Sequence, residues 1–267
     1  MRRNLILLGV LPYIGELTMK KFALLICLAA FVSCVETPAE IELPKYSIDD
    51  LIPLNDSTRS LYYNDAAYIE FRQLIQDSTK RYDQIKLQEQ NIISHYEDLL
   101  NIYNNSYSIS NSFFENISSI HTFDAYTLHH LHASVDTNKV WVEEWLNGSA
   151  YTGIVGIDSL IKNYDIEVSF SYESSGGYNF TLKTQMPINY FALKTKLEKT
   201  GEFRYVAPDI IIGGGRGIYL VGGNQKLYEY ILAWGDCPSG CIYSHYWEIE
   251  VTNQEITLLR EYGDPLP

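Results

Sequence analysis

Apolar and polar positions alternate most clearly in the second half of the chain. Between residues 166 and 172, Ile166, Val168 and Phe170 fall on one face, which indicates a strand. Ser174-Ser175-Gly176-Gly177 follows as a hairpin turn. The elements predicted around this turn are a helix at 153–164, strands at 166–172 and 178–184, a helix at 188–199 and a strand at 203–206. The pattern therefore predicts an α-β-β-α-β block.

This order is one strand short of the split β-α-β arrangement of ferredoxin-like folds. Two runs precede the block, at 123–135 and 140–146, and we expect both to be helices. If residues 140–145 form a strand instead, that strand would supply the missing first one.

Strand-like runs continue to the C-terminus. The predicted strands are 218–221, 227–236, 243–252 and 255–262. Asn253-Gln254 makes the last turn, so the final three strands form an antiparallel meander. The glycine-rich stretch before them, 211–217, lacks the following helix and the Lys and Ser/Thr of a phosphate-binding loop. We interpret it as a flexible connector.

A long helix is predicted in the first half of the chain, from about residue 66 to residue 103, with Asp65 as its cap. Its stripe has 3-4 spacing with one charged break, and consists of Tyr82, Ile85, Glu89, Ile92, Tyr96, Leu99 and Tyr103. Residues 104–120 are rich in Asn and Ser and indicate a loop. The fold class predicted is α+β: an N-terminal long helix and helical segment, then the ferredoxin-like α-β-β-α-β block, continuing into a C-terminal antiparallel β-meander.

The N-terminus has the pattern of a secretory signal peptide. Met19-Lys20-Lys21 precedes an apolar run that is too short to span a bilayer and ends at Cys34. The ending, Phe-Val-Ser-Cys, resembles a bacterial lipobox, although Phe31 stands where Leu is usual. We expect residues 1–33 to be removed, Met19 to be the true start and Cys34 to be lipidated, an anchor that needs no transmembrane helix. The alternative is an ordinary signal peptide cut nearby.

Composition and charge outline the rest of the chain. Residues 34–60 are an acidic, Pro-containing tether. We expect a mainly helical region at 61–148 and an α+β domain with a stapled β-hairpin at 149–267. The net charge is −13, and removing residues 1–33, with four basic and one acidic side chain, leaves −16. A chain with this negative charge is unsuited to bind nucleic acid or the surface of anionic lipid. We expect a cell-envelope protein, lipid-anchored to the outer membrane, that contacts membrane through its anchor only.

Cys237 and Cys241 are the cysteines that remain once the signal peptide is removed and Cys34 carries lipid. They flank a Pro-Ser-Gly turn between two predicted strands, and the expected compartment is oxidising, so we expect a disulfide. One alternative is a zinc site formed with His245 at even spacing. Another is a redox pair, although C-x-x-x-C between strands differs from C-x-x-C at a helix start.

Aromatic side chains surround this cysteine pair. We expect Trp234 and Trp247 to cover the sheet as a cross-strand pair. The alternative is an exposed platform for a sugar or protein partner, with Tyr243, Tyr246 and Trp247 as its rings. The candidate binding surface comprises Trp234, Asp236, Tyr243, His245, Tyr246 and Trp247.

Three histidines, His129, His130 and His132, cluster in one segment. On a helix His129 and His132 would share a face, and on a strand His130 and His132 would. Either pair could ligate a metal, but no carboxylate or cysteine stands at ligand spacing, so we expect partly exposed polar positions. We expect no catalytic residues, no metal and no cofactor.

The segment WGDCPSGCIYSHYW, residues 234–247, carries the most specific resemblance. The chain from Gly156 through this segment resembles secreted proteins and lipoproteins of Bacteroidota-type bacteria. Those proteins have Trp-Gly-Asp-Cys-x-x-Gly-Cys followed by His and Trp. That resemblance implies a location and a fold without an activity. Residues 150–209, ending Tyr-Val-Ala-Pro-Asp, resemble the prodomains of subtilisin-like proteases. No protease domain follows, so this second resemblance implies a protease-inhibitor-like module.

Several enzyme signatures are missing from the sequence, namely Gly-x-Ser-x-Gly, His-Glu-x-x-His and the dinucleotide-binding fingerprint. The sequence favours a lipid-anchored extracytoplasmic binding or interaction module with a protein or glycan partner. The alternatives are the protease-inhibitor-like module and an enzyme with an unrecognised site.

Overall fold

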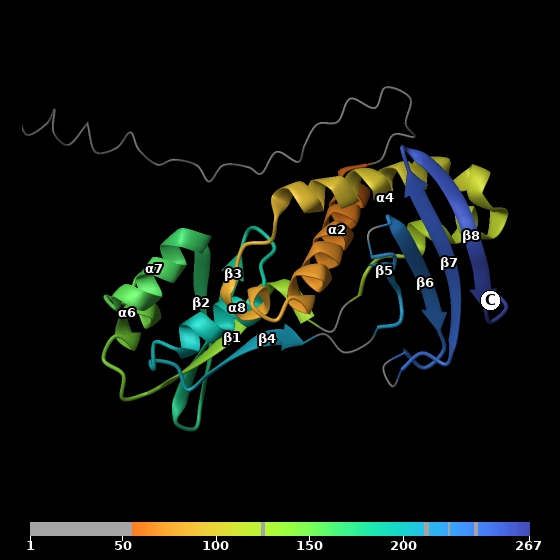
Figure 1. Cartoon of the computed structure of the whole chain (residues 1–267). Helices are drawn as coiled ribbons and strands as arrows, with labels where there is room; N and C mark the ends of the chain where they lie inside the picture. The colour runs from red at the N-terminus through yellow and green to blue at the C-terminus, as the bar shows by residue number, and fades with distance from the viewer. Residues whose placement is uncertain (1–54, 124–125, 211–213, 224, 238–239) are drawn as a thin grey trace, which may run out of the picture. The chain divides into compact units, whose positions relative to one another are not determined.

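The computed structural model describes residues 55–267 except 124–125, 211–213, 224 and 238–239. It has the predicted α+β fold, with helices and two four-stranded antiparallel sheets (Figure 1). The signal peptide, Cys34 and residues 34–54 of the acidic tether lie outside the described residues. Within the described ranges, no helix is both long and apolar enough to cross a membrane.

The first sheet has the complete ferredoxin-like topology. Its strands are β1 (Tyr126–Asp136), β2 (Ile166–Ser174), β3 (Gly177–Thr184) and β4 (Tyr205–Ile210). Their order is β2-β3-β1-β4, and every neighbouring pair is antiparallel. The predicted hairpin is confirmed as β2 and β3, and β1 supplies the strand that the α-β-β-α-β block lacked.

The predicted helix at 123–135 is wrong, because residues 126–135 lie in β1. Leu131, Ala133 and Val135 alternate along it and are fully buried, which is the two-residue period of a strand. The other interpretation, a strand at 140–145, is also wrong, because α6 (Val142–Leu146) is a helix as first expected.

Three helices pack against the apolar face of the first sheet: α6, α7 (Val155–Tyr164) and α8 (Tyr190–Glu198) (Figure 1). Trp145 of α6 contacts Phe180 of β3 at 5.0 Å between ring centroids. Ile157 and Ile161 bury one side of α7. These contacts leave the opposite face of the sheet without a helix from this group.

The second sheet contains β5 (Gly217–Leu220), β6 (Leu227–Trp234), β7 (Tyr243–Thr252) and β8 (Glu255–Gly263), in that order. The predicted meander is therefore confirmed. Asn253 and Gln254 have φ values of 51° and 70°, and positive values at both positions are those of the primed turn that suits a two-residue hairpin.

The helices before β1 are α2 (Asp56–Gln76), α3 (Lys80–Asp83), α4 (Glu89–Ile109), α5 (Asn111–Asn116) and η1 (Ile117–Ser119). The single helix predicted over 66–103 is wrong, and so is the loop over 104–120. Asn55, not Asp65, caps α2, since its side chain accepts the N–H of Thr58. Asp77 follows α2 directly, and its side chain accepts the N–H groups of Thr79 and Lys80 in the turn before α3.

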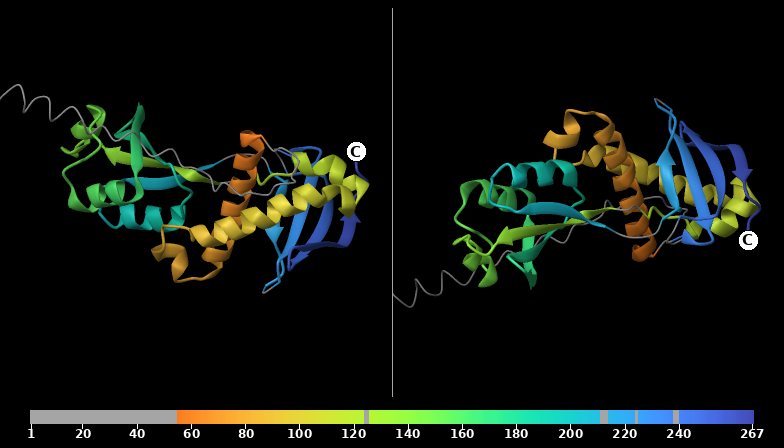
Figure 2. Two further views of the ribbon diagram at one scale, coloured as in Figure 1. Left: turned by 90° about the horizontal axis from the view of Figure 1, so that it is seen from above. Right: turned by 90° about the horizontal axis from the view of Figure 1, so that it is seen from below.

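Helices α4 and α5 cover the apolar face of the second sheet (Figure 2). Phe113 of α5 contacts Tyr230 of β6 at 5.0 Å and Trp247 of β7 at 5.7 Å between ring centroids. All three side chains are fully buried. The core of this half is therefore rich in aromatic side chains.

Candidate functional site

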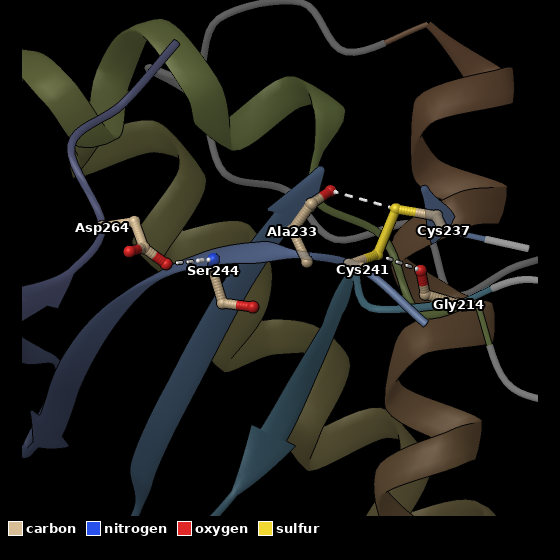
Figure 3. The surroundings of a disulfide bond; sticks show 6 residues. All are labelled: Gly214, Ala233, Cys237, Cys241, Ser244 and Asp264. Atoms are coloured by element: carbon tan, nitrogen blue, oxygen red, sulfur yellow. Dashed lines mark hydrogen bonds between the residues drawn. A yellow bond between two sulfur atoms is a disulfide. The ribbon is translucent and has the colours of Figure 1, made fainter. Parts of the chain in front are cut away.

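The cysteine pair between β6 and β7 forms a disulfide, with the two Cα atoms 4.0 Å apart (Figure 3). Sγ of Cys241 lies 2.9 Å from the carbonyl oxygen of Gly214, and Sγ of Cys237 lies 3.9 Å from that of Ala233. A disulfide sulfur carries no proton, so these are close sulfur–oxygen contacts. With both sulfurs bonded to each other, neither is a thiolate that could bind zinc.

The disulfide also explains one glycine of the connector between the two sheets. A Cβ on Gly215 would overlap Sγ of Cys241 and lie 2.9 Å from Cβ of Ala233. The backbone there has a φ of +97°, which glycine adopts without strain. Gly215 is therefore needed for close approach, and the connector is packed against the disulfide at this point.

We expect Cys237→Ser or Cys241→Ser to lower the free energy of unfolding by about 2 kcal/mol, the chain-entropy estimate for a five-residue loop. Urea unfolding followed by circular dichroism would measure this, and the double variant should lose no more than either single one. Intact mass should rise by two hydrogen atoms on reduction. Titratable thiols in the unreduced protein would contradict the disulfide.

The expected pairing of Trp234 with Trp247 is wrong. In the register, Trp234 lies opposite Tyr243, and Trp247 lies opposite Tyr230. The rings of Trp234 and Tyr243 stack at 5.8 Å between centroids. Trp247 is four residues beyond Tyr243 along β7, so the two tryptophans have different partners in the hairpin register.

The side chains of the candidate surface around the tip do not lie on one face of the second sheet. Asp236 and Tyr243 are exposed and Trp234 is partly exposed, whereas His245 and Trp247 are buried. Tyr246 lies on the other face, where its ring stacks on Tyr262. The three rings of the proposed platform therefore do not share one surface.

His245 is held within the second sheet. Its Nδ1 lies 2.7 Å from the carbonyl oxygen of Asp264, and its Nε2 lies 3.1 Å from Glu261. Changing His245 would break these contacts whether or not a metal binds, so this substitution cannot distinguish a disulfide from a zinc site. Across the described residues, no group of three or more His, Cys, Asp or Glu side chains converges as metal ligands would.

The three clustered histidines lie on a strand, β1, so His130 and His132 share a face, as expected for that alternative. Nε2 of His132 is 3.3 Å from Asp209 of β4. His129 bonds through Nδ1 to the carbonyl oxygen of Thr184, and burial lowers its pKa. His130 and His132 therefore belong to the open face of the first sheet.

A row of four side chains crosses this open face. The register places Tyr172 opposite Asn179, Asn179 opposite Ser134, and Ser134 opposite Tyr205, one residue from each strand. Phe180, Ala133 and Val206 are buried next to Asn179, Ser134 and Tyr205, so these three row residues point away from the helices. The register shift between Phe170 and Tyr172 brings Tyr172 opposite Asn179 on the same face. Three strand spacings separate the two tyrosine backbones by about 14 Å. Tyr172 is 57% exposed and Tyr205 is 44% exposed.

Hydrogen bonds fix the middle of this row. The hydroxyl of Tyr205 donates to Oδ1 of Asn179, two strands away, at 3.2 Å. The amide nitrogen of Asn179 donates to the carbonyl oxygen of Tyr172 at 3.3 Å and to Ser174 at 3.1 Å. To reach Asn179, the Tyr205 side chain must lie along the sheet over the buried Ser134. One face of its ring is therefore presented to solvent.

Polar side chains surround the row on the same face. They are Glu167, Ser169, Ser171, Thr181, Lys183, His132 and Asp209. Hydroxyls, an amide, two carboxylates, an ammonium group and an imidazole offer both donors and acceptors beside two flat rings. This combination suits a ligand that has hydroxyl groups and an apolar face.

The second sheet brings two carboxylates together on its outer face. Glu229 and Glu248 lie directly opposite each other on β6 and β7. Tyr262 donates to Glu229 at 2.8 Å, and Arg260 forms an ion pair with Glu248. Burial and these carboxylates raise the pKa of Tyr262 to about 12. Arg260 and Tyr262 offset the repulsion between like charges, which accounts for the pair as a structural network.

None of the row residues was singled out in the sequence analysis. Strict alternation from Ile166 would put Tyr172 on the apolar face. The register shift between Phe170 and Tyr172 moves it to the open face, so no local pattern marked this residue. The fold defines an α+β protein with a ferredoxin-like sheet and a second antiparallel sheet. Comparisons with family models, curated proteins and solved structures give no match to this chain.

Proposed function

We propose that the protein is a lipid-anchored extracytoplasmic binding module that holds a neutral glycan on the open face of its first sheet. The observation that supports this most strongly is the row of Tyr172, Asn179, Ser134 and Tyr205. Its end rings are exposed, and the hydroxyl of Tyr205 is held by Asn179. A ring that is already ordered loses little conformational entropy when a sugar stacks on it.

Charge and compartment support the same proposal. The net charge of −13 disfavours an anionic partner, so a neutral glycan fits better than a nucleic acid or an acidic polysaccharide. The Cys237–Cys241 disulfide suits an oxidising compartment. The lipobox-like ending at Cys34 and the acidic tether would hold the folded part outside the membrane.

We expect the mature protein to bind one class of neutral glycan on an array, and Tyr205→Ala to weaken that binding by about tenfold or more. Tyr172→Ala should weaken it as well, because both rings lie on the same row. Isothermal titration with the best glycan would measure each affinity. Tyr107→Ala, which removes a 74% exposed tyrosine from α4, is the matched control and should leave binding unchanged.

A substitution at the disulfide tip, Tyr243→Ala, tests whether the glycan binds there instead. If Tyr243→Ala abolishes glycan binding while the Tyr172 and Tyr205 variants bind normally, the ligand lies at the disulfide tip and the sheet-face proposal is wrong. Binding that none of these substitutions alters would also contradict it.

The anchor has a separate test. We expect Cys34→Ser to release the protein from membranes into the soluble fraction, because the acyl chains are attached through this sulfur. Fractionation followed by a carbonate wash would measure the change. A variant that stays with the membrane after the wash would place the anchor elsewhere.

The protease-inhibitor-like alternative needs a free tail after β4. β4 is an edge strand, which an inhibitor of this type could offer to a protease. The chain then continues to β5, and Gly215 packs against the disulfide on the way. This arrangement favours the binding module over an inhibitor whose tail enters an active site.

A further inference from the structure

A cavity of about 280 Å³ lies where three segments distant in sequence meet. These are the entry to α4, the end of α7 and the segment between β3 and α8. Lys86 pairs with Ile188 in an isolated β-bridge, and the N–H of Asn189 donates to the carbonyl oxygen of Ile85 at 2.8 Å. Backbone hydrogen bonds therefore hold two of the cavity walls together.

The floor of the cavity is apolar. Leu87, Ile92 and Ile188 line it and are 8%, 1% and 3% exposed, with the buried Pro187 beside them. Met186, which is 36% exposed, lies at the opening. An apolar group of the size of a leucine or phenylalanine side chain would be removed from water here.

The rim of the cavity is charged with both signs. Lys86, Lys162, Glu89 and Asp165 line the cavity and are exposed to solvent. In the described part of the chain, none of these four side chains forms an ion pair. Nζ of Lys86 lies 6.0 Å from the ring centroid of Tyr164, another wall residue, so its ammonium lies beside a wall of the cavity.

We propose that this cavity binds a small apolar zwitterion, of which a free amino acid with an apolar side chain is the simplest. The two lysines would attract a ligand carboxylate, but Glu89 and Asp165 would repel a ligand that has only that charge. A ligand with only an amine would be attracted by Glu89 and Asp165 but repelled by the two lysines. A molecule with both charges next to one apolar group matches the floor, the lysines and the acids together. This site is separate from the open sheet face.

Isothermal titration of the full mature protein with L-leucine and L-phenylalanine tests the proposal. Leucine should bind, whereas isocaproate, which lacks the amine, and isopentylamine, which lacks the carboxylate, should each bind about tenfold more weakly. Absence of binding by both amino acids would overturn the proposal. So would an analogue with a single charge that binds as tightly as leucine.

Substitutions at the rim locate the site. Lys162→Gln and Glu89→Gln should each weaken leucine binding by about tenfold, and Met186→Trp should abolish it by filling the opening. Lys199→Gln, at an exposed lysine outside the cavity lining, is the control and should bind normally. All four changes are at the surface, and circular dichroism would confirm that each variant is folded. Leucine binding unchanged in Lys162→Gln and Met186→Trp would place the ligand elsewhere and overturn the proposal.

Discussion

Replacing Asp65 by alanine is expected to lower the free energy of unfolding by about 2–5 kcal/mol, because two buried N–H groups would lose their acceptor. Asp65 is 1% exposed in the middle of α2. Its Oδ2 lies 2.7 Å from Nδ1 of His121, and its Oδ1 accepts the backbone N–H of Thr122 at 2.5 Å. Alanine would leave both donors buried without an acceptor, and it would leave a cavity.

The effect should be large because the carboxylate joins elements that are far apart in sequence. The hydroxyl of Thr122 accepts the N–H of Ile218 in β5 at 3.3 Å, so the network links α2, the approach to β1 and the second sheet. Asp65→Asn should cost less, since its amide oxygen can still accept from Thr122.

Urea unfolding at neutral pH would measure these changes. Asp56→Ala, at the exposed start of the same helix, is the control for loss of a helical carboxylate and should cost no more than about 1 kcal/mol. If Asp65→Ala unfolded at the same urea concentration as the wild type, the network would contribute nothing to stability.

The elements that the sequence predicted correctly have their signals within one segment. The β2–β3 hairpin combines alternation with a Ser-Ser-Gly-Gly turn, and α7 has a short amphipathic stripe. The meander has clear alternation and a two-residue turn whose residues tolerate positive φ. In each case propensity, pattern and turn chemistry agree, so no distant contact was needed to decide the structure.

The break between α2 and α4 depends on contacts that no local pattern contains. Apolar spacing continues from Tyr82 to Tyr103 as though one helix were present. In the structure, Ile85 is buried in an extended segment, and Asn189 donates to the carbonyl oxygens of Arg81 and Gln84 at 2.9 Å each. A side chain about a hundred positions away therefore stabilises the interruption, so spacing alone could not predict it.

The error at β1 has a local cause. The register of β1 with β4 shifts between Tyr126 and Leu131, which marks a bulge or irregularity. It places Leu128 and Leu131, both buried, at a three-residue spacing that imitates a helix. The alternation of Leu131, Ala133 and Val135 was the signal that could have identified the strand, but alanine and histidine weaken it.

The candidate sheet-face site could not be assembled without this strand. Ser134 supplies its floor, and His132 lies beside the row, so an assignment of 123–135 as a helix removes the centre of the face. Tyr172 and Tyr205 are 33 positions apart in the sequence, and only the β2-β3-β1-β4 order aligns them. At the tip, by contrast, the sequence identified the disulfide but could not fix the hairpin register that separates Trp234 from Trp247.

Lowering the pH from 6.5 to 4 is expected to destabilise the protein by about 3 kcal/mol through His95 alone, from the difference between its folded and ordinary pKa values. His95 is 7% exposed on α4. Burial lowers its pKa from 6.5 to about 4, an effect that Asp98 opposes and Lys226 reinforces. Within this pH range the unfolded chain binds a proton that the folded protein excludes. Stability is therefore fully present above pH 6.5 and is lost as the pH falls toward 4.

The hydrogen bonds around His95 indicate which neutral form is present. Tyr228 donates its one proton to Oδ2 of Asp98 at 2.5 Å, so Nδ1 of His95, 2.9 Å from the same hydroxyl, must carry a proton and donate it. Nε2 is then the unprotonated nitrogen. It faces the side-chain amide of Gln73, which can supply an N–H by turning its nitrogen toward the ring. A second proton on His95 would remove this acceptor and place a charge in the core.

Urea unfolding of the wild type and of His95→Gln between pH 7 and pH 4 isolates this contribution, because the carboxylates that also titrate in this range are common to both proteins. His95→Gln should be less stable at pH 7, where it loses the bond to Tyr228, and its stability should fall less steeply as the pH decreases. His130→Gln, at a partly exposed histidine of β1, is the matched control and should keep the pH dependence of the wild type. Parallel profiles for the wild type and His95→Gln would show that His95 is protonated equally in the folded and unfolded chains, and the proposed cause of the acid sensitivity would be wrong.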